Sequence, residues 1–170
     1  MLVRNKHYRS VWLDEGDPWC VVTFDQRRLP WDVKLLEIRS VEDAFIAIRD
    51  MAVRGAPLIG GIGALGLYLA TGEAPKDDFD NYLHRSAQYL KTARPTAVNL
   101  HYGVERVLQA IQKGKSIDEN QALARREALR LLDDEVAMSV AIGDHGKVMI
   151  RKISLAKNGE PVNILTHCNA

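Results

Sequence analysis

Two arginines each stand just before a predicted helix, an arrangement suited to binding a phosphate. The first is Arg54, which opens the run Arg-Gly-Ala-Pro. Pro57 lacks an amide hydrogen and has a φ close to the helical value, so it fits the start of a helix that follows a turn at residues 54–56. Free amides at that turn carry the positive end of the helix dipole, and a guanidinium can hold a phosphate through two parallel hydrogen bonds. The alternative is that the glycine and proline only mark the start of a helix and that no ligand binds there.

The second arginine, Arg94, precedes Pro95. Proline disfavours helical geometry in the residue before it, and Thr96 can then cap the helix that follows. A second guanidinium is therefore expected at a helix start. An exposed arginine without a ligand is the alternative, and it would be the better interpretation if Arg54 were absent.

The composition is that of a globular chain with small or protein partners. The chain has 170 residues, of which 46% are hydrophobic, and 23 Lys and Arg balance 22 Asp and Glu. This balance predicts binding neither to nucleic acid nor to an anionic membrane. The uncharged run Gly55–Gly72 is barely long enough to span a bilayer and is rich in glycine, so we expect no membrane span. Cys20 and Cys168 show no metal-ligand spacing, and the first residues lack an apolar signal core, so the cytoplasm is the expected location.

The elements that lead to Arg54 are predicted to be a small antiparallel β-meander and one helix. Strands are expected at residues 8–13, 20–24 and 33–38, with turns between them. Cys20 lies in the second strand, where a small core residue is a better interpretation than a reactive thiol. Ser40–Asp43 has the layout of a capping box, which predicts that a helix begins there.

Four glycines in the apolar run after Pro57 predict a helix that packs closely against its neighbours. Each interior glycine costs about 1 kcal/mol relative to alanine, so burial must compensate. We therefore expect a central, buried helix that closes near residues 71–72. Further helices are predicted after Asp78, after Thr96 and after Ser116, and the last of these is expected to be long and to run through Val136 and Val140.

The last residues predict the start of a second domain. Val162–Thr166 is a short apolar run after a long helix, as at the beginning of a parallel α/β sheet. One parallel strand cannot form a sheet, so residues 1–157 are expected to form one domain and residues 158–170 to begin another. Cys168 follows this strand, and ligands of open α/β sheets bind beyond the carboxyl ends of strands. A structural cysteine is the alternative at that position.

Three runs together resemble the methylthioribose-1-phosphate isomerase family. They are Val53–Gly60, Ala93–Leu100 and Ile164–Ala170, in this order and spacing. These aldose–ketose isomerases of methionine salvage are related to the regulatory subunits of the translation-initiation nucleotide exchange factor. The resemblance implies an α+β N-terminal domain, with a small antiparallel β-meander and a helical bundle, followed by the first strand of a truncated Rossmann-like α/β domain.

The resemblance also implies a reaction and its residues. It assigns substrate binding to Arg54, Gly55, Ala56 and Arg94, and it makes Cys168 the counterpart of the family's active-site cysteine. The reaction converts 5-methylthioribose 1-phosphate into 5-methylthioribulose 1-phosphate in a cytoplasmic homodimer, with no metal or other cofactor. The family's catalytic aspartate has no counterpart in these 170 residues, so the chain alone is expected to be inactive.

Other members of the wider family are the alternatives. Ribose-1,5-bisphosphate isomerases lack the Pro-X-Ile-Gly continuation that follows Ala56 here, and the regulatory subunits lack the Cys-Asn pair that begins at Cys168. A non-catalytic regulatory or phosphosugar-sensing module of the same fold also stays open.

Overall fold

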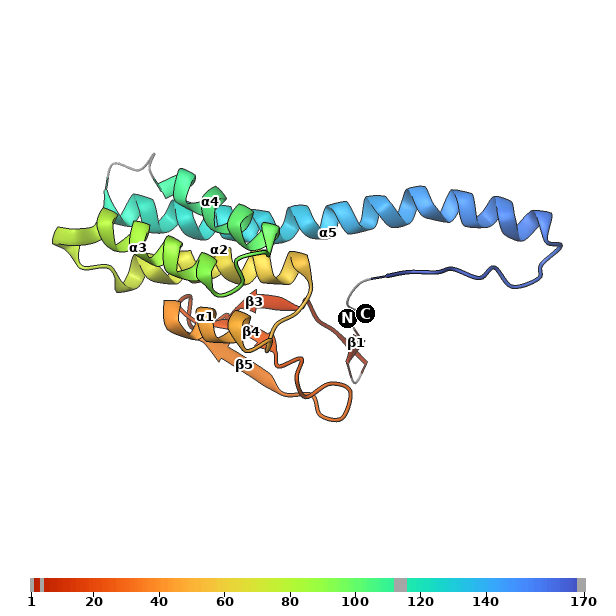
Figure 1. Ribbon diagram of the computed structural model, residues 1–170, viewed down its shortest axis with the longest axis horizontal. Coiled ribbons are helices and arrows are strands. Elements are labelled where there is room, and N and C mark those ends of the chain that lie inside the picture. The colour runs from red at the N-terminus through yellow and green to blue at the C-terminus, as the bar shows by residue number, and fades with distance from the viewer. Residues whose placement is uncertain (1, 4, 112–115, 168–170) are drawn as a thin grey trace. The chain divides into compact units, whose positions relative to one another are not determined.

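The computed structural model describes residues 2–3, 5–111 and 116–167 (Figure 1). The chain forms two units, Met1–Leu131 and Leu132–Ala170. The domain boundary expected between residues 157 and 158 stays a prediction. No helix among the described residues combines the length and the apolar character needed to cross a membrane.

The first unit begins with antiparallel strands, as predicted. A short hairpin pairs β1 with β2, and a three-stranded sheet follows in the order β3-β4-β5. The central strand β4 is buried throughout, and its Val22 lies opposite both Trp12 of β3 and Glu37 of β5. The meander is confirmed, although each strand is shorter than its sequence pattern. The bounds are Leu2–Val3 (β1), Lys6–His7 (β2), Val11–Leu13 (β3), Val21–Phe24 (β4) and Leu35–Ile38 (β5).

Helix α1, Val41–Arg49, begins at the predicted capping residue. The amide of Asp43 donates to Ser40 Oγ at 3.0 Å, which satisfies one of the free donors at the helix start. The Asp43 carboxylate accepts in turn from the amide of Arg39 at 3.0 Å, one residue before the cap. The second hydrogen bond of this capping box is therefore made with Arg39, which lies outside the helix.

Helix α2, Ala56–Glu73, is the central helix of the first unit. Its residues from Leu58 to Thr71 are all buried, as expected for a helix that is apolar on every side. The prediction of a central, buried helix is therefore confirmed. The helix starts one residue before Pro57 and extends slightly beyond the predicted end.

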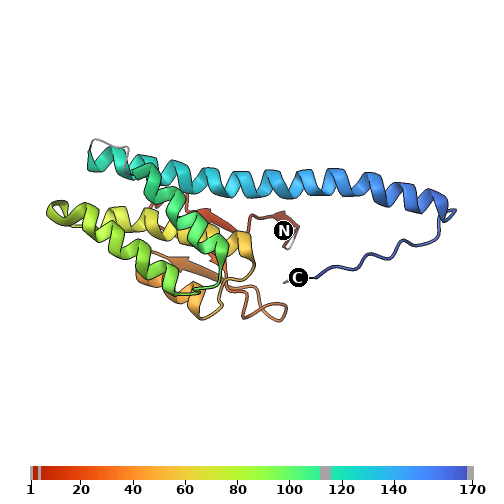
Figure 2. The same ribbon diagram turned by 45° about the horizontal axis from the view of Figure 1, so that its top comes forward.

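Helices α3, Phe79–Thr92, and α4, Val98–Ile111, pack on α2 in opposite directions. The short 3₁₀ turn η1, Lys76–Asp78, reverses the chain after α2. Tyr82 near the start of α3 donates to Glu73 at the end of α2, so α3 runs antiparallel to α2. Helix α4 reverses again and runs parallel to α2 (Figure 2).

Helix α5, Ile117–Ala156, is the longest element. Its start is capped as predicted, because the amide of Glu119 donates to Ser116 Oγ at 3.2 Å. Within the first unit, Gln121 donates to the carbonyl of Thr71 on α2 at 2.9 Å, and Glu127 forms an ion pair with Arg106 on α4. This part of α5 therefore closes the helical bundle.

The second unit differs from the sequence prediction at its end. The long helix runs through Val136 and Val140 as expected, and these side chains are 46% and 58% exposed. Val162–Thr166 does not form the expected strand, since residues 160–167 carry neither helix nor strand. A strand requires a neighbour to satisfy its backbone donors and acceptors, and none of the described strands pairs with this run. The expected Rossmann-like sheet is accordingly not confirmed.

Candidate functional site

The start of α2 combines backbone donors with an arginine side chain. Gly55 is the residue before the first helical turn and has φ 95° and ψ 132°, a conformation that side-chain-bearing residues rarely adopt. No side chain within the described ranges caps this helix, and its first turn holds no acidic residue. Arg54 is exposed, and its side chain has no hydrogen bond or ion pair within the described part of the chain. This helix start therefore carries uncompensated positive charge.

The start of α4 has the same character. Arg94 is half-buried, and among residues 2–3, 5–111 and 116–167 its side chain has no hydrogen-bonding or ionic partner. The residue at the capping position is Ala97, whose carbonyl accepts from the amide of His101 at 3.4 Å, so the prediction that Thr96 takes this position is wrong. Alanine has no side-chain oxygen to satisfy the amides of the first turn. No acidic residue lies in this first turn either.

Close packing of α2 and α4 brings these two helix starts together. Gly60 of α2 faces Asn99 of α4, and Gly63 faces Leu100 and Val104. Residue numbers increase in the same direction along both helices, so the pair is parallel. Figures 1 and 2 both show the two helices starting at the same end of the bundle. We call this end the arginine edge, defined by Arg54–Ala56 and Arg94.

The arginine edge is electrostatically suited to a phosphate. Two parallel helices place the positive ends of their dipoles side by side, and each start adds a guanidinium. No carboxylate in either first turn competes with a bound anion. The arrangement can hold a phosphorylated ligand by backbone amides and by two charge-assisted contacts.

A cavity of about 450 Å³ lies at the opposite end of the bundle. It is formed where α4 ends and where α3 and α5 begin, and Phe79, Leu108 and Ile117 line it. The two helix starts that carry Arg54 and Arg94 do not contribute to it. This cavity is therefore separate from the arginine edge.

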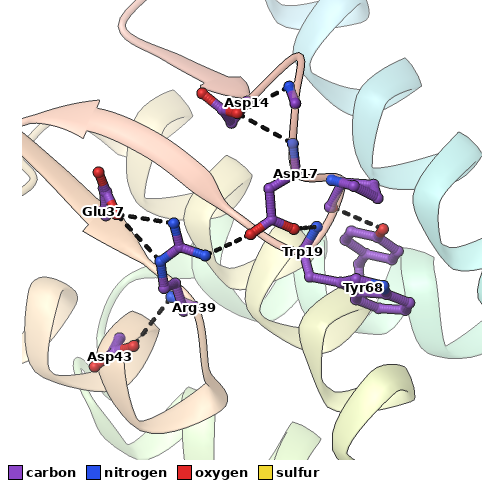
Figure 3. A network of polar contacts seen from close by, with 9 residues as sticks. Asp14, Asp17, Trp19, Glu37, Arg39, Asp43 and Tyr68 are labelled. Atoms are coloured by element: carbon purple, nitrogen blue, oxygen red, sulfur yellow. Dashed lines mark hydrogen bonds and ion pairs between the residues drawn. The ribbon is translucent and has the colours of Figure 1, made fainter.

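The polar network around Arg39 holds the fold together rather than forming a reactive site (Figure 3). Arg39 donates to Glu37 and to Asp17, and this bonding lowers the pKa of the Asp17 carboxyl. Asp14 accepts from two amides of the same turn at 2.9 and 3.1 Å. Because these groups satisfy one another, the network stabilises the β3–β4 turn. The sequence predicted that turn, but nothing in it indicated that Arg39, which is distant in sequence, would bond to Asp17 in the turn.

The remaining predicted site residue, Cys168, lies outside the described residues. Among the described residues, no three His, Cys, Asp or Glu side chains are arranged to hold a metal ion. The structure therefore brings together the two arginine-bearing helix starts, whereas the ligand-binding roles of Arg54, Gly55, Ala56 and Arg94 stay predictions.

Comparison with known proteins identifies relatives of two kinds. The methylthioribose-1-phosphate isomerase of Desulfatibacillum aliphaticivorans is 42% identical over 173 residues, which cover 100% of this chain and 46% of that protein. The enzyme of the same name from Gluconobacter oxydans (strain 621H) is 41% identical and is covered to 45%. The chain thus spans less than half the length of these curated relatives.

Two solved structures share the fold. The translation initiation factor eIF-2B subunit delta from A. fulgidus has a TM-score of 0.70 and 40% identity, over 76% of this chain and 38% of that one. The 5-methylthioribose 1-phosphate isomerase from Pyrococcus horikoshii OT3 has a TM-score of 0.69 and 31% identity, over 76% and 37%. A family model described as the initiation factor 2 subunit family matches residues 52–170. The chain, with its parallel pair of arginine-bearing helix starts, belongs to the initiation factor 2 subunit family.

Proposed function

We propose that the complete protein that contains this chain isomerises 5-methylthioribose 1-phosphate to 5-methylthioribulose 1-phosphate. The observation that carries the proposal is the parallel packing of α2 and α4, which brings two helix starts to one edge, each with an arginine that has no hydrogen-bonding or ionic partner among the described residues. Relatives that match the whole chain at about 40% identity bear the name of this isomerase. A phosphorylated sugar is a ligand that fits both the positive charge of the arginine edge and the names of these relatives.

The chemistry divides between this chain and the rest of the protein. A phosphate on the anomeric carbon blocks spontaneous ring opening, so acid–base assistance is needed before hydrogen moves between C1 and C2. The arginine edge would hold the phosphate and fix the sugar. Cys168 would lie beside the reacting carbons, and an aspartate from the remainder of the protein would transfer the proton. Neither role requires a metal or nucleotide.

The proposal is tested by removing each arginine from the complete protein. Arg54→Ala and Arg94→Ala should each lower kcat/KM by about 10- to 100-fold, since a charge-assisted hydrogen bond contributes about 1.5–3 kcal/mol. Arg85→Ala is the matched control, because Arg85 is 63% exposed on α3 and bonds Asp78 instead. Unchanged kcat/KM in both arginine-edge variants, measured by ketose formation, would overturn the assignment.

A non-catalytic, phosphosugar-sensing module is the second candidate. It is favoured by the A. fulgidus eIF-2B delta structure, which is more similar in sequence to this chain than the P. horikoshii isomerase structure is. A sensor would bind the phosphosugar without turnover, and Cys168→Ser would leave that binding unchanged. An enzyme would lose kcat in the same variant.

Ribose-1,5-bisphosphate isomerase is the related activity, and assays with ribose 1,5-bisphosphate as the substrate test for it.

We also infer a cytoplasmic homodimer, and light scattering of the complete protein tests its oligomeric state. A monomer that turns over at the full rate would contradict the dimer.

A further inference from the structure

We propose that the backbone contact between Gly60 on α2 and Gly103 on α4 positions the two arginine-bearing helix starts relative to each other. We call it the glycine contact. The proposal rests on the proposed function, because it assigns these glycines a role in phosphate binding. Both glycines are buried between the helices and act through the helix starts, so they are positioning residues.

The glycine contact has no room for a side chain. A methyl group built on Gly103 would lie 2.3 Å from the carbonyl oxygen of Gly60. A methyl group built on Gly60 would lie 2.7 Å from the carbonyl oxygen of Asn99. Both obstacles are backbone atoms, so no side-chain rotation can relieve them. The two helices must move apart to admit even one carbon atom.

A side chain of α5 also borders this contact. The methyl group built on Gly103 would lie 3.2 Å from a terminal carbon of Leu131 on α5. Helix α5, which is tied to α2 through the Gln121 bond to the Thr71 carbonyl, therefore borders the same contact.

The glycine contact lies near the arginine edge. Gly60 is four residues after Ala56, the first residue of α2, and Gly103 is five residues after Val98, the first of α4. At about 1.5 Å per residue, these positions lie roughly 6 and 7.5 Å from the helix starts. A displacement of the two helices at the contact would therefore move both helix starts by nearly the same distance. A misplacement of about 1 Å can change a reaction rate by about 100-fold.

Gly63 provides a matched comparison within the same pair of helices. A methyl group there would lie 2.5 Å from Cδ1 of Leu100 and 3.2 Å from Cγ2 of Val104. These atoms are the ends of side chains, and the Leu100 side chain can rotate away. Alanine at Gly63 should strain the packing without separating the helix backbones. Gly143, which has nothing within 4 Å of an added methyl, is the open-space control.

The test compares Gly103→Ala, Gly63→Ala and Gly143→Ala in the complete protein. Gly103→Ala should raise KM and the inhibition constant of inorganic phosphate by about tenfold or more, with a smaller change in kcat. Gly63→Ala should lower Tm but keep KM within about twofold, and Gly143→Ala should keep KM unchanged. A Gly103→Ala protein with lower Tm and wild-type values of both constants would show that the contact is only structural.

Two further variants complete the test of the positioning role. If Gly103→Ala fails to fold, Gly60→Ala replaces it, because its methyl meets the Asn99 carbonyl at the longer distance of 2.7 Å. The same tenfold effect on phosphate inhibition is expected, and a wild-type value would overturn the proposal. Arg54→Ala separates the two hypotheses. If it weakens phosphate inhibition while the glycine variants do not, the positioning role fails and the proposed function stands.

Discussion

Trp19 stacks on Tyr68, with ring centroids 4.9 Å apart and ring planes 11° apart (Figure 3). The Tyr68 hydroxyl donates to the carbonyl of Pro18 at 2.9 Å. Burial raises the pKa of the Tyr68 hydroxyl, so this donor keeps its proton well above neutral pH. The turn between β3 and β4 is therefore joined to the buried helix α2 by both an aromatic and a polar contact.

Tyr68→Phe should remove the polar contact and keep the stack. The lost hydrogen bond leaves the Pro18 carbonyl without this donor, and we expect the free energy of unfolding to fall by about 0.5–1.5 kcal/mol. Urea denaturation followed by circular dichroism measures the change. A stability equal to that of the wild type would show that water replaces the hydroxyl at no cost.

Gly55→Ala should destabilise the protein although space is available for the methyl group. Nothing lies within 4 Å of an added Cβ, but φ is 95° at this residue. Holding a residue with a side chain in such a conformation costs about 1–3 kcal/mol. Gly143→Ala is the control, since alanine in an open helix interior should keep or raise Tm. Equal Tm values for the Gly55→Ala variant and the wild type would show that the turn adopts another conformation.

Asp25→Asn should destabilise the protein at neutral pH but not in strong acid. Arg27 donates to both carboxylate oxygens at 2.8 Å, and this bonding lowers the pKa of Asp25 below its ordinary value of 3.8. A carboxyl with a lowered folded-state pKa stabilises the fold above its unfolded pKa, and this contribution disappears as the pH falls through the folded value.

We expect a difference of about 1 kcal/mol between wild type and Asp25→Asn at pH 7. The difference should shrink as the pH drops below 3.8. Thermal denaturation of both proteins across this range gives the comparison. A difference that does not vary with pH would assign the effect of the substitution to shape rather than charge.

The Cys20 thiol should be inert in the folded protein. Cys20 is 1% exposed, and burial raises its pKa. Few thiolates form at neutral pH, and a reagent cannot reach the sulfur without local opening. In a Cys168→Ser variant of this 170-residue chain, Ellman's reagent should label the remaining thiol only after denaturant is added. Rapid labelling of the native variant at pH 8 would contradict the burial of Cys20.

Local patterns in the sequence were sufficient to predict much of the first unit. The capping residues Ser40 and Ser116 both accept the predicted amide, because a cap depends on residues three positions apart. Cys20 is buried as expected for a core residue. The glycines of α2 correctly indicated close packing. They did not indicate that α4 would be the partner or that the two helices would run parallel.

Apart from the local cap expected at Thr96, the sequence failed where interactions with segments distant in the chain decide the outcome. The strand expected at Val162–Thr166 requires a neighbouring strand, which an apolar run alone cannot supply. The apolar residues of the predicted long helix include Val140, which is 58% exposed, because periodicity does not say whether anything covers a helix face. For the arginine edge, the sequence placed Arg54 and Arg94 at helix starts. Only the tertiary packing brings these starts together.

Helix α3 makes this arrangement possible although the arginine edge includes none of its helical residues. Consecutive helices joined by short connections run antiparallel, so two helices become parallel only when an odd number of helices lies between them. Deletion of α3 would reverse α4, and its start would lie beside the end of α2, which is 18 residues long or about 27 Å. Substitutions in α3 that preserve its packing are therefore tolerable, whereas its removal would separate Arg54 from Arg94 by most of the bundle's length. Helix number, as well as residue identity, is a requirement of this site.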